Sequence, residues 1–211
     1  MSMPGDHIIE QYEKHAETWV QARLRERSFL EKSWLDRFCS LLPSHANILD
    51  CGCGAGEPIA TYLTAQGHTV TGIDSSETMV RMFRDRLPNQ RALVQDMRKL
   101  SLAETFDGIL AWDSFFHLNP DDQRRMFPVF RAHAKPGAAL MFTSGSSHGE
   151  AIGVLQGEPL YHASLDSAEY QILLEDHGFH VTQNVVKDQN CGGRAIWLAQ
   201  CITSHRVISN D

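Results

Sequence analysis

From residue 46 onward the chain alternates between short apolar runs and amphipathic helical segments, and this alternation constrains the fold more than any other feature. Apolar runs typical of buried strands cover residues 46–52, 68–75, 91–97, 106–113 and 138–144. Segments with helical periodicity cover residues 58–67, 75–88 and 120–134. Strands that alternate with helices form a mostly parallel sheet with right-handed crossovers and helices on both faces. The sequence therefore predicts an α/β domain.

Both ends of the chain depart from this alternation. Before residue 45 the pattern is helical, and Tyr12 and Trp19 share one apolar face, so we expect two helices that form a cap over residues 1–44. Near the other end, a helix at 164–178 is followed by strands at 179–188 and 194–201. The short polar connection between these strands predicts a hairpin, which makes the last strand antiparallel to its neighbour.

The same patterns divide the chain. Residues 45–201 are predicted to form the main domain, with residues 202–211 as a tail. The stretch at 143–160 is dense in glycine and serine, and we expect it to be a long loop.

Composition excludes several classes of protein. The 211 residues include 19 Lys and Arg against 26 Asp and Glu, for a net charge of −7, which disfavours a nucleic-acid partner. No apolar run reaches the length of a membrane helix, and the polar start lacks a secretory signal, so a cytoplasmic protein without a membrane partner is expected. The five cysteines suggest neither a disulfide framework nor a metal site, since Cys51 and Cys53 lack a second ligand pair.

A glycine-rich turn follows the first strand, at the place where open α/β sheets bind ligands. Gly52, Gly54 and Gly56 follow Asp50, and Asp74 ends the next strand 18 residues after Gly56. An acid at that position can accept both hydrogens of a ribose diol. The glycine order is not that of a dinucleotide-binding turn, and Glu57 would repel a pyrophosphate. A ligand with ribose, without phosphate and with positive charge fits better, although Asp50 and Asp74 are also suited to a purely structural role at a turn.

The run from Ile48 to Gly56 resembles the D-x-G-C-G-x-G signature of class I S-adenosylmethionine-dependent methyltransferases. The resemblance covers about residues 45–201 and implies a Rossmann-like, doubly wound, seven-stranded and mostly parallel sheet with an antiparallel last strand. It implies S-adenosyl-L-methionine as the cofactor. The residues that it assigns to the cofactor are Asp50, Gly52, Cys53, Gly54, Gly56, Asp74, Ser75, Asp96, Met97 and Trp112, with Tyr12, Trp19 and Arg23 from the cap.

Some of these residues keep a second interpretation. Asp96 is placed to accept from the adenine amino group, but it is also a candidate helix N-cap. Met97 either packs on the adenine or fills a gap in the core. Arg23 either reaches the cofactor's carboxylate or lies on a solvated helix face.

Candidate catalytic residues follow the fourth predicted strand. Asp113 and His117 stand beside the expected methyl group, and a four-residue spacing at the start of a helix would let Asp113 fix the tautomer of His117 as a general base. His148 and His162 in the expected loop are alternatives. His117 can also be a structural hydrogen-bonding group, in which case positioning alone accounts for catalysis.

The acceptor is expected to be a small molecule methylated on O, N or S without a metal, by a monomer or a homodimer. The motifs of amino-methylating and cytosine-methylating nucleic-acid enzymes are missing from the sequence, as is the Asp-Asn pair that holds magnesium in catechol-type enzymes. Two other functions remain open at this point: an NAD(P)-dependent oxidoreductase, and a non-catalytic regulatory subunit that binds S-adenosylmethionine.

Overall fold

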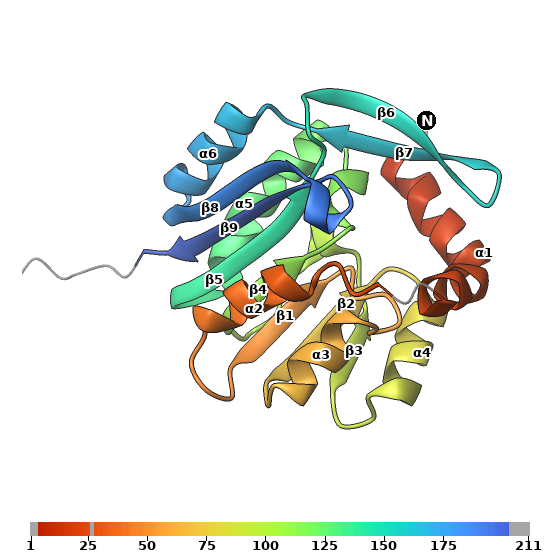
Figure 1. Ribbon diagram of the computed structural model, residues 1–211, viewed down its shortest axis with the longest axis horizontal. Coiled ribbons are helices and arrows are strands. Elements are labelled where there is room, and N and C mark those ends of the chain that lie inside the picture. The colour runs from red at the N-terminus through yellow and green to blue at the C-terminus, as the bar shows by residue number, and fades with distance from the viewer. Residues whose placement is uncertain (1–3, 26–27, 203–211) are drawn as a thin grey trace, which may run out of the picture.

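The computed structural model describes residues 4–25 and 28–202, and its central feature is a seven-stranded sheet (Figure 1). The strand order is β3-β2-β1-β4-β5-β9-β8. β9 is antiparallel to both of its neighbours, and the other pairs in the sheet are parallel. The predicted mostly parallel sheet with an antiparallel last strand is therefore confirmed. The strands are β1 (Asn47–Cys51), β2 (Thr69–Asp74), β3 (Arg91–Val94), β4 (Phe106–Ala111), β5 (Ala134–Ser144), β8 (Phe179–Asp188) and β9 (Arg194–Cys201).

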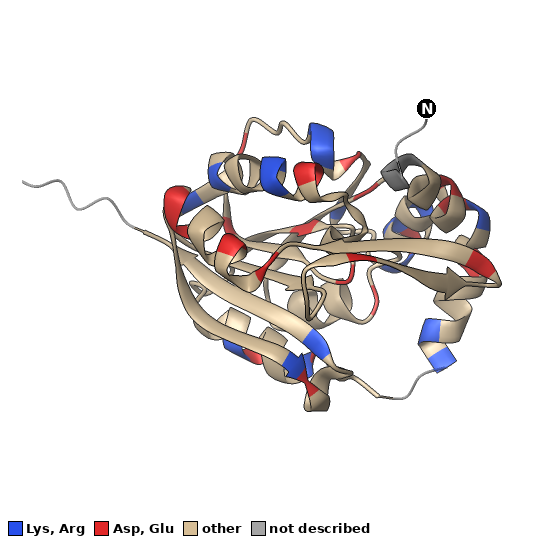
Figure 2. Cartoon of the chain, turned by 90° about the horizontal axis from the view of Figure 1, so that it is seen from above, with Lys and Arg blue, Asp and Glu red and all other residues tan. Residues whose placement is uncertain are grey.

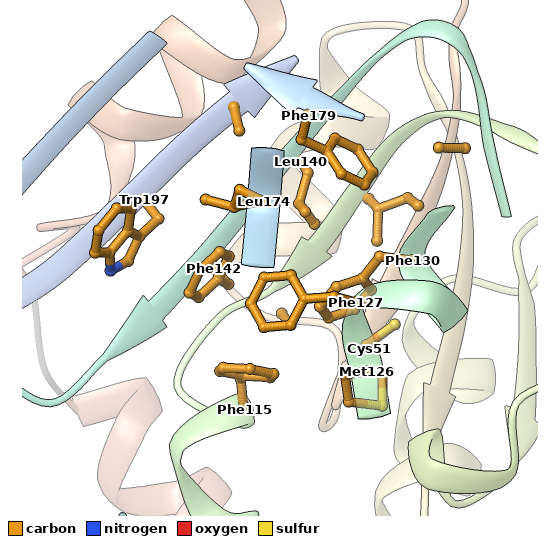
Figure 3. Close-up of a cluster of buried hydrophobic side chains, with 14 of the residues drawn as sticks. Cys51, Phe115, Met126, Phe127, Phe130, Leu140, Phe142, Leu174, Phe179 and Trp197 are labelled. Atoms are coloured by element: carbon orange, nitrogen blue, oxygen red, sulfur yellow. The ribbon is translucent and has the colours of Figure 1, made fainter. Parts of the chain in front are cut away.

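Helices cover both faces of the sheet (Figure 1). One face packs against α2 (Lys32–Ser40), α3 (Ile59–Ala65) and α4 (Glu77–Arg86), and the other against α5 (Pro120–His133) and α6 (Ser167–Asp176). The α5 face is rich in aromatic side chains (Figure 3). There the rings of Phe142 and Trp197 stack with their centroids 6.0 Å apart. Burial of aromatic rings is the largest apolar contribution to a core of this kind.

The helix starts follow the local sequence signals. The Ser76 hydroxyl accepts a hydrogen bond from the Met79 backbone N–H and caps α4, and the Asn119 side chain caps α5 through the Asp122 N–H. Pro120 occupies the first turn of α5, where a missing N–H costs nothing. These caps hold the helices against the sheet at the ends nearest the carboxyl ends of the strands.

The prediction of a long loop at 143–160 is wrong, because most of this segment belongs to a β-hairpin. β6 (Gly149–Leu155) and β7 (Glu158–Ser164) pair in an antiparallel two-stranded sheet. Gln156 and Gly157 join them with φ angles of 50° and 85°, the backbone signs that a two-residue hairpin turn requires. The density of glycine and serine at 143–153 obscured this turn in the sequence.

The hairpin lies next to α1 (Pro4–Arg25), outside the main sheet (Figure 1). The Gln11 side-chain amide donates to the Pro159 carbonyl at 2.7 Å, and Lys14 forms an ion pair with Glu158. α1 also packs on α4 through Ala16, Val20 and Met79. The helix therefore spans the space between α4 and the hairpin, above the carboxyl ends of the strands.

Acidic and basic residues are interspersed along the helices (Figure 2). The described part of the chain contains no helix that is both long and apolar enough to cross a membrane.

Candidate active site

A pocket lies where the carboxyl ends of β1, β2 and β4 meet the underside of α1. Every residue that the sequence assigned to the cofactor or to catalysis lines this pocket: Tyr12, Trp19, Arg23, Asp50, Gly52, Cys53, Gly54, Gly56, Asp74, Ser75, Asp96, Met97, Trp112, Asp113 and His117. These residues come from five separate segments of the chain. The parallel strand order brings them together, because it places all the carboxyl ends at one edge.

The three glycines of the turn have different neighbours. A Cβ atom at Gly52 would lie 2.3 Å from the Ser114 Cβ, and one at Gly56 would lie 2.8 Å from the Phe83 ring. At Gly54 the nearest atom is 3.9 Å away, on Trp19. Gly52 and Gly56 are thus required by packing within the protein, whereas Gly54 leaves open space in the pocket. A ligand can approach the backbone closely there.

Asp74 is held rigidly at the end of β2. Its carboxylate accepts hydrogen bonds from the backbone N–H groups of Gly54 and Ser76, both at 2.9 Å. A carboxylate offers about four lone-pair directions, so the two oxygens can still accept from a ribose diol. Desolvation raises the pKa of Asp74.

Asp50 lies beneath the turn and is 3% exposed. Burial, and after it the charge of Asp74, raise the pKa of Asp50 to about 7. The floor of the pocket therefore carries two buried acidic groups, each of which raises the cost of ionising the other. A positively charged ligand would lower this cost, so the floor suits a cation. The glycine cradle and these acids together fit S-adenosylmethionine, a cation with a ribose and no phosphate.

Asp96 is the N-cap of the short 3-10 helix η1 (Met97–Lys99), where it accepts from the Arg98 backbone N–H at 2.9 Å. It also forms an ion pair with the Arg98 guanidinium at 2.7 Å. The capping role that the sequence left open is therefore present. A contact with adenine would have to share this carboxylate with Arg98.

Arg23 does not lie on a solvated helix face. Its guanidinium forms an ion pair with Glu31, whose side chain is fully buried at the N-cap position of α2. Both residues line the pocket. The sequence analysis missed Glu31, because a charged stretch between two helices carries no signal that one of its acids becomes buried.

His117 occupies the pocket wall below α1, at the end of the 3-10 helix η2 (Phe115–His117). Its Nδ1 lies 3.0 Å from the Tyr161 backbone oxygen, and its Nε2 lies 2.9 Å from the Tyr12 hydroxyl. A carbonyl can only accept, so Nδ1 carries the hydrogen and Nε2 accepts from Tyr12. Burial lowers the pKa of His117 to about 4, so the imidazole is neutral at neutral pH. Burial also raises the pKa of Tyr12, which keeps its hydroxyl protonated.

The predicted pairing of Asp113 with His117 is wrong. Both nitrogens of His117 are engaged elsewhere, and the Asp113 carboxylate instead forms a bidentate ion pair with Arg194 at 2.6–3.0 Å. The left-handed backbone of Asp113, with φ 48°, and the 3-10 form of η2 break the helical geometry that a four-residue contact needs.

The alternative histidines fall in different places. Neither of them lines the pocket. The ring of His162, on β7, lies behind the pocket wall, with its centroid 4.9 Å from that of the His117 ring. Within the described ranges, no cluster of three His, Cys, Asp or Glu side chains is arranged to hold a metal ion. Besides Glu31, the pocket residues that the sequence analysis missed include Ile8, Ile9, Arg98, Ser114 and Leu118.

Comparison with known proteins agrees with this geometry. Residues 48–137 match the model of a methyltransferase domain family. An uncharacterized methyltransferase of Alkaliphilus oremlandii is 26% identical over 134 residues, covering 61% of this chain and 62% of the relative. Methyltransferase GfsG of Streptomyces halstedii is 30% identical over 121 residues, covering 52% of this chain and 43% of the relative. The matched regions thus span less than two thirds of these relatives.

Solved structures share the whole fold. The 1,6-didemethyltoxoflavin-N1-methyltransferase of Burkholderia thailandensis, solved with 1,6-didemethyltoxoflavin and S-adenosylhomocysteine, superimposes with a TM-score of 0.75. The match covers 96% of this chain and 92% of that one at 17% identity.

Proposed function

We propose that this chain is a class I S-adenosylmethionine-dependent methyltransferase and that it methylates an N, O or S atom of a small-molecule acceptor. The observation that carries the proposal is a single pocket that combines the open glycine turn and acidic floor with the Tyr12–His117 pair under α1. The Burkholderia enzyme with a similar fold is a 1,6-didemethyltoxoflavin-N1-methyltransferase, which supports a small-molecule acceptor.

We assign the cofactor to the glycine turn. Gly54 would receive it, Asp74 would hold the ribose hydroxyls, and Asp96 with Met97 would lie at the adenine. When bound, S-adenosylmethionine supplies a methyl group already activated on a sulfonium. Catalysis by the protein then consists mainly of placing the acceptor atom in line at close range and excluding water. Of the predicted cap over residues 1–44, residues 4–25 and 28–44 would cover this site, and the rest lie outside the described residues.

Tyr12 is suited to orient the acceptor. Its hydroxyl hydrogen is donated to His117 Nε2, so the hydroxyl oxygen can only accept further hydrogen bonds. An acceptor with an N–H or O–H group would donate to that oxygen and turn its lone pair toward the methyl group. His117 is then a positioning residue that acts through Tyr12.

The low pKa of His117 argues against a full proton transfer to it. Moving a proton from a group with an ordinary pKa of about 10 to one of about 4 costs about 8 kcal/mol, at 1.36 kcal/mol for each pH unit. An acceptor that arrives as a neutral amine or a thiolate avoids this cost. We therefore propose that such acceptors are preferred over alcohols.

The test is a turnover screen with S-adenosylmethionine labelled in its methyl group. Panels of small amines, thiols, phenols and alcohols are incubated with the protein, and transfer of label is measured. We expect transfer to at least one amine or thiol class. Tight binding of the cofactor without transfer to any panel would support a regulatory subunit instead, and specific binding of NAD(P) would support the oxidoreductase.

A further inference from the structure

One end of the pocket is apolar. Ile8 and Ile9 lie on α1, one helical turn before Tyr12, and Leu118 directly follows His117. The 2.9 Å hydrogen bond between the Tyr12 hydroxyl and His117 Nε2 joins these two segments, so the three apolar side chains lie around that contact. Ile8 and Leu118 are buried, whereas Ile9 is half-buried and keeps accessible surface. The end of the pocket that these three side chains form, called the apolar end below, suits an apolar group of a ligand.

The apolar end is distinct from the place assigned to the cofactor. Trp19 approaches the glycine turn, where it would lie 3.9 Å from a Cβ atom at Gly54. Ile9 precedes Trp19 by ten residues on the same helix, which places the two about 15 Å apart along the helix axis. A cofactor seated on the glycine turn, with its ribose at Asp74, therefore leaves the apolar end to the acceptor.

Charge restricts which acceptors can bind. Apart from the floor acids Asp50 and Asp74, every carboxylate that lines the pocket forms an ion pair with an arginine. These pairs are Arg23–Glu31, Arg86–Glu57, Arg98–Asp96 and Arg194–Asp113. Within the described part of the chain, an anionic acceptor would thus meet arginines that are already paired, above an acidic floor. Because burial of a charge without a partner is costly, the pocket disfavours an acceptor that carries a carboxylate or a phosphate.

The supply of protons restricts the acceptor further. Among the described residues at the apolar end, none is placed to remove a proton, because both nitrogens of His117 are engaged and Tyr12 keeps its own proton. An acceptor nitrogen must therefore arrive with its lone pair free. An aliphatic amine has an ordinary pKa of about 10.4, so only about one molecule in a thousand is neutral at pH 7.4. A thiolate has no hydrogen to donate to the Tyr12 oxygen, which can only accept.

We propose that the acceptor is an uncharged arylamine or N–H heterocycle, whose ring packs on Ile8, Ile9 and Leu118 while its N–H donates to the Tyr12 oxygen. The inference rests on the proposed function and narrows its acceptor class. The acceptor nitrogen bonds to the methyl carbon as the methyl–sulfur bond breaks, the electron pair of that bond stays on sulfur, and the surplus proton on nitrogen leaves to water. Ile9 is then a specificity residue, because its accessible side chain meets the part of the acceptor that does not react.

The first test measures kcat/KM for matched acceptors with methyl-labelled S-adenosylmethionine. Aniline is compared with 4-aminobenzoate, benzylamine and benzenethiol, and benzimidazole is compared with benzimidazole-5-carboxylate. At pH 7.4 we expect each neutral compound to exceed its carboxylate derivative by at least about 100-fold, because the carboxylate would be buried unpaired. The rate with benzylamine should rise about tenfold for each pH unit from pH 6 to 8, as its neutral fraction grows, whereas the rate with aniline should stay flat.

The second test changes the charge of the apolar end. Ile9→Lys places a cation there, so the ratio of kcat/KM for the carboxylate derivative to that for the neutral compound should rise by at least about tenfold. Calorimetric titration of S-adenosylhomocysteine should give an affinity within about threefold of that of the unaltered protein, because the glycine turn is unchanged. Ile172→Lys makes the same substitution on the exposed surface of α6, where the side chain is 56% exposed, and should leave the ratio unchanged.

Ile9→Thr provides a second variant in case Ile9→Lys does not fold. It should lower kcat/KM for the neutral compounds by about three- to tenfold, through lost apolar contact, and leave S-adenosylhomocysteine binding unaffected. The proposal is overturned if the carboxylate derivatives react as fast as the neutral compounds, if label passes only to benzenethiol, or if neither Ile9 variant changes acceptor preference. If S-adenosylmethionine binds but no compound is methylated, the proposed function itself fails, which is a different result.

Discussion

Replacing Asp50 by asparagine is expected to stabilise the cofactor-free protein, and to do so more strongly as the pH rises. Burial and the charge of Asp74 raise the pKa of Asp50 from an ordinary 3.8 to about 7. The folded chain therefore keeps a proton that the unfolded chain releases. The stability that this proton provides is complete below pH 3.8 and is lost as the pH rises toward 7. Asparagine has nearly the same shape and does not ionise, so the variant escapes this loss.

The size of the effect follows from the two pKa values. The difference between 3.8 and about 7 corresponds to about 4 kcal/mol of unfolding free energy, reached near pH 8. At pH 5 the unfolded chain has gained only about 1.5 kcal/mol from ionisation. For a chain of this length, 1 kcal/mol shifts the unfolding temperature by roughly 2–4 °C. Asp50→Asn should therefore raise it by roughly 8–16 °C at pH 8 and by roughly 3–6 °C at pH 5.

Thermal unfolding by scanning calorimetry at pH 5 and pH 8, without cofactor, measures this directly. Asp85→Asn, on the exposed surface of α4, removes one acidic charge without burial and should shift the unfolding temperature by the same small amount at both pH values. The reasoning is refuted if Asp50→Asn gives an equal shift at both pH values or destabilises the protein at pH 8. Either result would mean that Asp50 is ionised in the folded chain.

Three further expectations concern the site. Asp74→Ala should weaken the binding of S-adenosylmethionine and of S-adenosylhomocysteine alike, by about 1.5–3 kcal/mol for each hydrogen bond lost. If calorimetric titration gives the variant the same affinities as the unaltered protein, Asp74 is not part of the site. Gly54→Val should abolish cofactor binding, since its side chain would enter open pocket space, and normal binding would make the glycine only a turn former. Because φ at Gly54 is 51°, a conformation that strains a β-branched residue, the comparison counts only if circular dichroism shows a native fold. The unaltered protein should have a pH–rate profile that is flat from about pH 6 to 9 and falls toward pH 4 as His117 takes a proton. His117→Ala should lower kcat by less than about tenfold and should lose this fall, whereas a loss of about 10²–10⁴ would identify His117 as a general base.

The parts of the fold that sequence predicted well are those where local pattern and tertiary position coincide. The end of β2 at Asp74 follows from a buried strand that stops at a polar residue, and parallel topology then fixes where that residue points. The starts of α4 and α5, which the helical segments at 75–88 and 120–134 predict, are equally local. These features are determined by the identity of a few neighbouring residues, so a local pattern is enough to predict them.

The predictions that failed, and the contacts that were missed, depend mostly on residues far apart in the sequence, which a local sequence pattern does not reveal. The Asp113–His117 pairing assumed α-helical spacing, but residues 115–117 form a 3-10 turn and Arg194, 81 residues away, takes the carboxylate. Glu31 is buried in an ion pair with Arg23 of α1, eight residues before it in the sequence. The Tyr12–His117 contact likewise joins segments 105 residues apart. Each of these partners depends on how α1 and the last strands close over the sheet.

The distribution of tryptophan gives the protein a built-in optical signal. Trp34 and Trp197 are sealed in the core, at 0% and 3% exposure, and supply a constant background of fluorescence. Trp19 and Trp112 line the pocket, one on the cap and one at the end of the sheet. A ligand that fills the pocket would change the emission of these two indoles more than that of the two buried in the core. Occupancy of the site, and the speed with which it fills, can therefore be followed by stopped-flow fluorescence on the unlabelled protein.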